Sequence, residues 1–73
     1  MIVHVKMMGV LKKYGDNQCL WVKNNTSIQE VIEILDIPKR SVALVSINNA
    51  RSDMHAILRY GDTIKIVGFV AGG

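Results

Sequence analysis

The sequence has few of the residues from which catalytic and metal sites are built. Its 73 residues include one cysteine and two histidines. A lone thiol, Cys19, cannot form an internal disulfide, and this cysteine usage is typical of a reducing cytoplasm. His4 and His55 have no cysteine or carboxylate at metal-ligand spacing. We therefore expect a cytoplasmic protein that binds no metal and carries no disulfide.

Long apolar runs and catalytic motifs are also missing. The longest apolar runs, such as 66–71, fall far short of the roughly 18 residues that a membrane span requires. Residues 1–6 contain no long apolar segment of the signal-peptide kind. There is no glycine-rich phosphate loop after a strand and no CxxC or HExxH motif, and nothing in the sequence supports a Cys/His pair. The sequence thus predicts neither membrane contact nor an internal catalytic site.

The excess of positive charge is mild. Nine Lys and Arg face six Asp and Glu, which gives a net charge of +3. The positive residues are scattered along the sequence, beside one Trp, two Tyr and one Phe. Nucleic-acid binders usually combine a basic stripe with stacking aromatic residues. We therefore expect a solvated basic surface and no nucleic-acid partner.

Alternation of apolar and polar residues predicts the strands. Residues 3–7 have the period-two pattern of a half-buried strand, and 18–22 form its hairpin partner after a loop at 9–17. Two later strands are predicted at 41–47 and 63–69, with a short return strand at 51–53. These segments are enough for a sheet of four to five strands.

One helix is predicted between the second and third strands. Ser27 and Glu30 have the spacing of a capping box, and Thr26 with Gln29 offers the same pattern one residue earlier. Pro38 cannot continue the helix. One apolar stripe at i, i+3, i+4 and i+7 would face the sheet; it comprises Ile28, Val31, Ile32 and Leu35.

The order of these elements predicts the fold. A hairpin, a crossing helix and further strands fit an α+β layer of one mixed sheet with one main helix packed on it. If the last strand pairs in parallel with the first, the result is a β-grasp, or ubiquitin-like, roll. We expect residues 1–73 to form a single domain, with 70–73 as a flexible C-terminal tail.

The C-terminus is the one place where the sequence indicates chemistry. Gly72 and Gly73 end the chain directly after the last strand. A four-residue tail can reach about 13 Å at about 3.3 Å per residue. Glycines without Cβ atoms can pass through a narrow channel, which would present the Gly73 carboxylate to a partner enzyme. ATP would activate it as an acyl-adenylate. The alternative is a frayed terminus without a role.

The sequence resembles the MoaD/ThiS family of sulfur carriers over its whole length. The similarity comprises the first strand and loop at 5–11, the helix, Ser46-Ile47-Asn48-Asn49, the Leu58, Gly61-Asp62 and Ile64 pattern, and the terminal Val70-Ala71-Gly72-Gly73. The resemblance implies that an E1-like adenylyltransferase adenylates Gly73 and that a persulfide-bearing sulfurtransferase delivers sulfur. The resulting Gly73 thiocarboxylate would donate that sulfur, so the chain would be a carrier rather than an enzyme and would bind no cofactor.

The resemblance leaves more than one sulfur acceptor open. The first strand and its loop resemble the small subunit of molybdopterin synthase, whose large subunit binds a cyclic pterin precursor. Carriers for thiamine, which serve thiazole synthase, tend to begin with a Val-Asn-Gly hairpin that is absent here. Molybdopterin-synthase small subunits often have prolines where this chain has Gly68 and Phe69, and they are commonly acidic, whereas the pI here is about 9.3. A ubiquitin-like protein modifier and a β-grasp binding module with an incidental Gly-Gly are further alternatives.

Alternation along the last strand predicts a docking surface beside the tail. Val67 and Phe69 should face outward, with Leu44 on the neighbouring strand and Val70 and Ala71 leading to the terminus. Exposed apolar clusters mark partner sites. The alternative is that the chain's own loops cover these residues.

Overall fold

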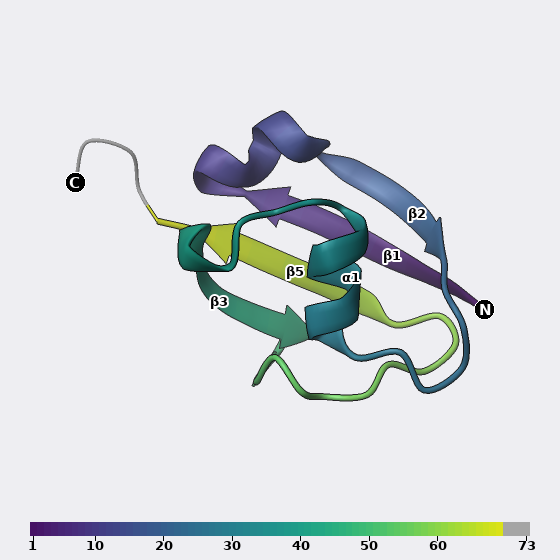
Figure 1. The fold of residues 1–73 in the computed structure, drawn as a ribbon. Helices are drawn as coiled ribbons and strands as arrows, with labels where there is room; N and C mark the ends of the chain where they lie inside the picture. The colour runs from purple at the N-terminus through teal and green to yellow at the C-terminus, as the bar shows by residue number, and fades with distance from the viewer. Residues whose placement is uncertain (70–73) are drawn as a thin grey trace.

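The computed structural model describes residues 1–69 and contains one mixed sheet (Figure 1). Its strand order is β2-β1-β5-β3-β4. One α-helix and two 3-10 helices, η1 and η2, complete the fold. The elements are β1 (Ile2–Met8), η1 (Gly9–Tyr14), β2 (Asn17–Trp21), α1 (Ile28–Ile34), η2 (Lys39–Ser41), β3 (Val42–Ile47), β4 (Ala50–Ser52) and β5 (Thr63–Gly68).

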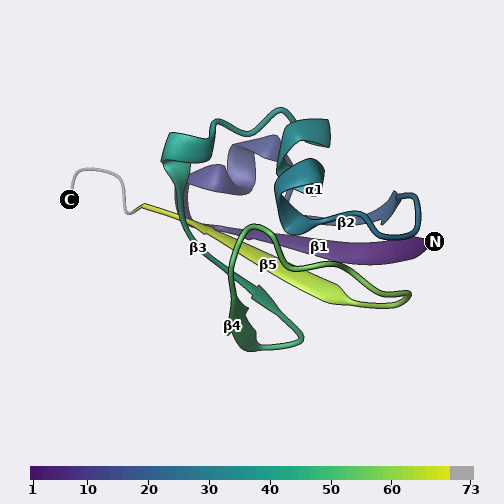
Figure 2. The ribbon, with the colours of Figure 1, turned by 60° about the horizontal axis from the view of Figure 1, so that its bottom comes forward.

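The predicted parallel pairing of the first and last strands is confirmed. β1 and β5 run side by side in the centre of the sheet, with Val5 opposite Ile64 and Met7 opposite Ile66. These side chains are buried beneath α1. Figure 2 shows α1 on one side of the sheet and the other side uncovered. The element order and this pairing give the predicted β-grasp roll; the face away from α1 is called the open face below.

The predicted helix and its cap are confirmed. The Glu30 backbone N–H donates to Ser27 Oγ at 3.3 Å, and the Glu30 carboxylate accepts from the Ser27 backbone N–H, which completes the capping box. The alternative start at Thr26 is wrong, because the Thr26 hydroxyl donates to the Lys23 carbonyl instead. The apolar stripe faces the sheet, with Ile28, Val31 and Ile32 fully buried and Leu35 packed at the edge of the core.

The segment predicted as a hairpin loop, 9–17, is more ordered than expected. Its first six residues form η1, which buries Leu11 completely against the core. A single buried residue has no period, so the pattern gave no sign of this element. Two predicted strand ends differ by one residue from the structure. Ser41 belongs to η2 and not to β3, and Phe69 follows the end of β5.

An asparagine turn connects β3 and β4 and is tied to the start of β5. Asn48 and Asn49 both have positive φ, 51° and 70°, as their tight turn requires. The Asn48 side-chain amide donates to the Asp62 carboxylate at 3.0 Å, and its oxygen accepts from the Thr63 backbone N–H. Asp62 also accepts from the Arg59 backbone N–H. These bonds fix the start of β5.

Residues 1–69 contain neither a membrane-crossing helix nor a cluster of metal-ligating side chains. No helix there is long and apolar enough to cross a membrane. That part of the chain also contains no group of three or more His, Cys, Asp or Glu side chains placed to hold a metal ion.

Candidate functional site

The candidate site lies where β5 ends. The proposed reacting group on Gly73, together with Gly72, Ala71 and Val70, falls outside the described residues. The structure does show the base from which these residues continue. β5 is flanked by β1, with which it pairs as far as Val67, and by β3, with which it pairs as far as Gly68, so the strand is held on both edges nearly to its end.

Two glycines allow η1 to pack against the end of β5. A Cβ on Gly68 would lie 2.7 Å from Leu11 Cγ and 3.0 Å from Val10 Cγ2. Gly9 has a φ of +72°, and a Cβ there would lie 3.2 Å from the Gly68 carbonyl oxygen. This close approach explains why glycine stands at both positions. Sequence reasoning missed it because the contact joins opposite ends of the chain.

Two of the predicted docking residues, Leu44 and Val67, lie on the open face. Leu44 and Met8 both pair with Val67, so these three residues form a row across β1, β5 and β3, called the apolar row below. Leu44 is 39% exposed and Val67 half-buried, while Phe69, just beyond β5, is 58% exposed. The alternative that loops cover them is wrong for Leu44 and Phe69. Met8 was missed, although its alternation with Met7 was a usable signal.

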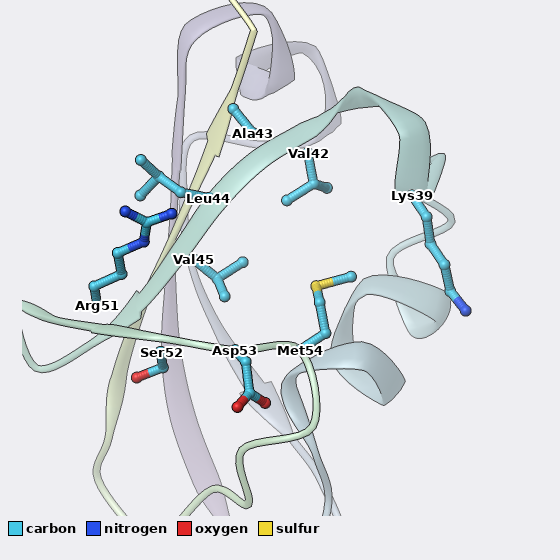
Figure 3. Close-up of a pocket in the computed structure, with 9 residues that line it drawn as sticks. All are labelled: Lys39, Val42, Ala43, Leu44, Val45, Arg51, Ser52, Asp53 and Met54. Atoms are coloured by element: carbon cyan, nitrogen blue, oxygen red, sulfur yellow. The ribbon is translucent and has the colours of Figure 1, made fainter.

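A β-bulge turns Leu44 toward this face. The pairing of β3 with β5 shifts by one residue between Val42 and Leu44, which leaves Ala43 as the extra residue. An extra residue in one strand reverses the alternation of its side chains. Val42 and Val45 therefore face α1, whereas Leu44 faces away from it. Figure 3 shows Val42 and Val45 on one side of β3 and Leu44 on the other.

A surface cavity of about 580 Å³ adjoins this part of β3. Its apolar wall comes mainly from β3, and Met54 points into it from the segment after β4 (Figure 3). Its polar lining is Lys39, Arg51, Ser52 and Asp53. Ser52 Oγ donates to the Ala50 carbonyl and Asp53 accepts from the His55 backbone N–H, so these two groups are not paired as a nucleophile and a base.

The structure brings together one pair that the sequence did not support. Cys19 and His4 are register partners on β2 and β1, and Cys19 Sγ lies 3.3 Å from His4 Nδ1. Both side chains are exposed on the open face. His4 pairs on its other side with Thr63, at the start of β5. The pair therefore lies at the opposite end of β5 from Gly68 and does not contribute to the tail site.

Comparison with known proteins gives one family and several similar folds. The fold is similar to SAMP1 from Haloferax volcanii, with a TM-score of 0.79 and 12% identity over 100% of both chains. The putative molybdopterin converting factor subunit 1 of Pyrococcus furiosus has a TM-score of 0.76 and 14% identity, covering 96% of this chain and 99% of that one. A chain of the Helicobacter pylori complex of molybdopterin-converting factor subunits 1 and 2 has a TM-score of 0.69 and 24% identity over 100% of both.

The TM-scores of these structures show that the chain shares their ubiquitin-like fold. A search of curated proteins finds no match to the sequence. The profile of the ThiS family, in contrast, matches residues 5–73, which include every strand but the first residues of β1 and extend through the terminal glycines. The chain therefore belongs to the ThiS family of ubiquitin-like sulfur carriers.

Proposed function

We propose that this protein is a sulfur carrier that acts through the carboxylate of Gly73. An oxygen of that carboxylate attacks the α-phosphorus of ATP on an E1-like adenylyltransferase, and pyrophosphate leaves. The terminal sulfur of a sulfurtransferase persulfide then attacks the acyl carbon, and AMP leaves. A second thiol cleaves the resulting acyl disulfide, forming a new disulfide and releasing the Gly73 thiocarboxylate.

One observation carries the proposal: the family match continues through Gly73, so the terminal Gly-Gly belongs to the matched region. The base of the tail supports it. β5 is held on both edges, and the apolar row and Phe69 lie beside its end, where a partner enzyme that receives the tail would dock. In this scheme the partner supplies ATP binding and catalysis, and the carrier supplies the acyl group.

We propose molybdopterin synthesis as the destination of the sulfur, with the large synthase subunit as the final partner. The similarity to molybdopterin converting factor subunits of two organisms favours this destination over thiazole synthesis. The fold is shared equally with a small archaeal modifier protein, which favours a protein modifier as the second candidate. A modifier would form an amide between Gly73 and a lysine, so conjugates in cell extracts would distinguish the two.

The test is a chemical analysis of Gly73 in protein purified from its native cell. A thiol-selective alkylating probe should label Gly73, whereas a variant lacking Gly73 should show no label there. Mapping by peptide is necessary, because oxidation of the four methionines mimics the mass gain of sulfur. An unlabelled carboxylate after incubation with ATP, a sulfur donor and the cell's adenylating enzymes would refute the proposal.

The substitution Phe69→Asp should weaken binding to the adenylating enzyme without unfolding the protein. Phe69 is 58% exposed, so its loss should change stability by no more than about 0.5 kcal/mol. A buried aromatic anchor at an interface contributes about 2 kcal/mol or more, a loss of at least about thirtyfold in affinity. Titration calorimetry measures the binding.

Tyr60→Asp is the matched control for this substitution. Tyr60 is 79% exposed and precedes β5, at the end remote from Gly68. The Tyr60→Asp substitution makes the same change in charge as Phe69→Asp and removes an aromatic ring of similar size. Equal binding by the Phe69→Asp variant and the unmodified protein would show that Phe69 is not part of the docking surface.

A further inference from the structure

Three cations that are far apart in the sequence form a row across the open face. Lys6 of β1 is the register partner of Lys65 of β5. Lys65 pairs in turn with Ser46 of β3, and Ser46 pairs with Arg51 of β4. Neighbouring strands lie about 4.8 Å apart, so the three charges, called the basic row below, fall on one line perpendicular to the strands. Cations that are scattered along the sequence are therefore brought into one row on this face.

Within residues 1–69 no member of this row forms a salt bridge, although Asp16 and Asp53 lie beside the ends of β2 and β4. None of the five strands contains Asp or Glu. Glu30 and Glu33 belong to α1, on the other side of the sheet, and the one salt bridge within residues 1–69 joins Glu33 to Lys39. Like charges at directly paired positions repel each other. Carboxylates from another molecule would relieve this repulsion.

The basic row is continuous with the apolar row. On β1 and β5, Met8 and Val67 lie two residues after Lys6 and Lys65. On β3, which runs in the opposite direction, Leu44 lies two residues before Ser46. On each strand the member of the apolar row is on the same face and nearer the end of β5. Figure 3 shows Arg51 on the same side of β3 as Leu44. Lys6 and Arg51 are exposed, and Lys65 is half-buried. The open face thus presents cations first and then apolar side chains toward the tail.

We propose that the basic row binds carboxylates on the docking surface of the adenylating enzyme, beside the apolar contact made by Leu44 and Phe69. This inference rests on the proposed function. An acidic protein surface suits the row better than a nucleic acid, because toward the tail the row adjoins aliphatic and methionine side chains, and at the neighbouring strand positions on its other side His4 is the one ring on which a base could stack. The positive face would also steer the enzyme and the carrier together, an effect that salt weakens.

The experiment measures binding of the full chain to the purified adenylyltransferase of the same cell, at low and high NaCl, together with ATP–pyrophosphate exchange. The variant is Lys6→Glu with Lys65→Glu. The control is Lys23→Glu with Arg40→Glu, which changes the net charge equally at two exposed positions outside the five strands. At low salt the first variant should bind at least about tenfold more weakly, and the control should bind like the unmodified protein. High salt should remove the difference.

The outcomes separate this inference from the proposed function. If the unmodified chain is adenylated and both variants bind equally well, the basic row has no part in docking. If binding responds to charge as expected but Gly73 is never adenylated, the surface assignment stands and the carrier function fails. A labelled single-stranded oligonucleotide is the third probe. If the unmodified chain binds it in a way that Lys6 and Lys65 control, and enzyme binding is unaffected, the row is a nucleic-acid site and the inference is overturned.

Discussion

One additional alanine after Gly73 is expected to abolish adenylation and thiocarboxylate formation. The carboxylate is the reacting group, and an added residue displaces it by about 3.3 Å in an extended chain. A displacement of about 1 Å can cost about a hundredfold in rate, so the loss should exceed this factor. The rate of ATP–pyrophosphate exchange with the adenylyltransferase measures the effect, and peptide-mapped alkylation measures the product.

The extended chain should fold normally, because the change lies beyond the five strands and the helix. Its thermal unfolding midpoint and circular dichroism are therefore the controls. Docking at the apolar row should also persist, which would make the extended chain a competitive inhibitor of the unmodified one. Normal adenylation of the extended chain would favour a binding module with an incidental Gly-Gly.

Replacing Gly68 with alanine is expected to destabilise the protein by about 1–3 kcal/mol, the usual cost of overpacking a closed site. The new methyl group would lie 2.7 Å from Leu11 Cγ, and Leu11 is fully buried with little room to move. For a domain of this size the unfolding midpoint should fall by roughly 4 °C or more. Chemical denaturation gives the free energy of unfolding directly.

A double-mutant cycle tests whether this clash is the cause. Leu11→Ala alone should cost about 2–5 kcal/mol, because it empties a buried site. If the two side chains collide, the double variant should lose less stability than the two single losses combined. Strictly additive losses would show that Gly68 is required for another reason. Movement of the η1 contact should also lower the adenylation rate, because this contact holds the strand that leads to Gly73.

The sequence by itself determined the local elements and the reacting end. Period-two alternation located β1 and β5, and the i, i+3, i+4, i+7 stripe with the Ser27 capping box located α1. These patterns are readable because each depends on residues within one or two turns or a few strand positions. The terminal Gly-Gly could likewise be recognised from neighbouring residues alone. The burial of Leu11 could not be predicted, because one buried residue in a short 3-10 helix has no period.

Only the tertiary structure decided which distant residues meet. The register of β1, β5, β3 and β4 assembles the basic row and places Cys19 against His4. The bulge near Ala43 sets the face on which Leu44 lies. A shift of one residue in any pairing would move these side chains to the other face. Register depends on packing between segments far apart in the chain, so no local pattern in the sequence contains it.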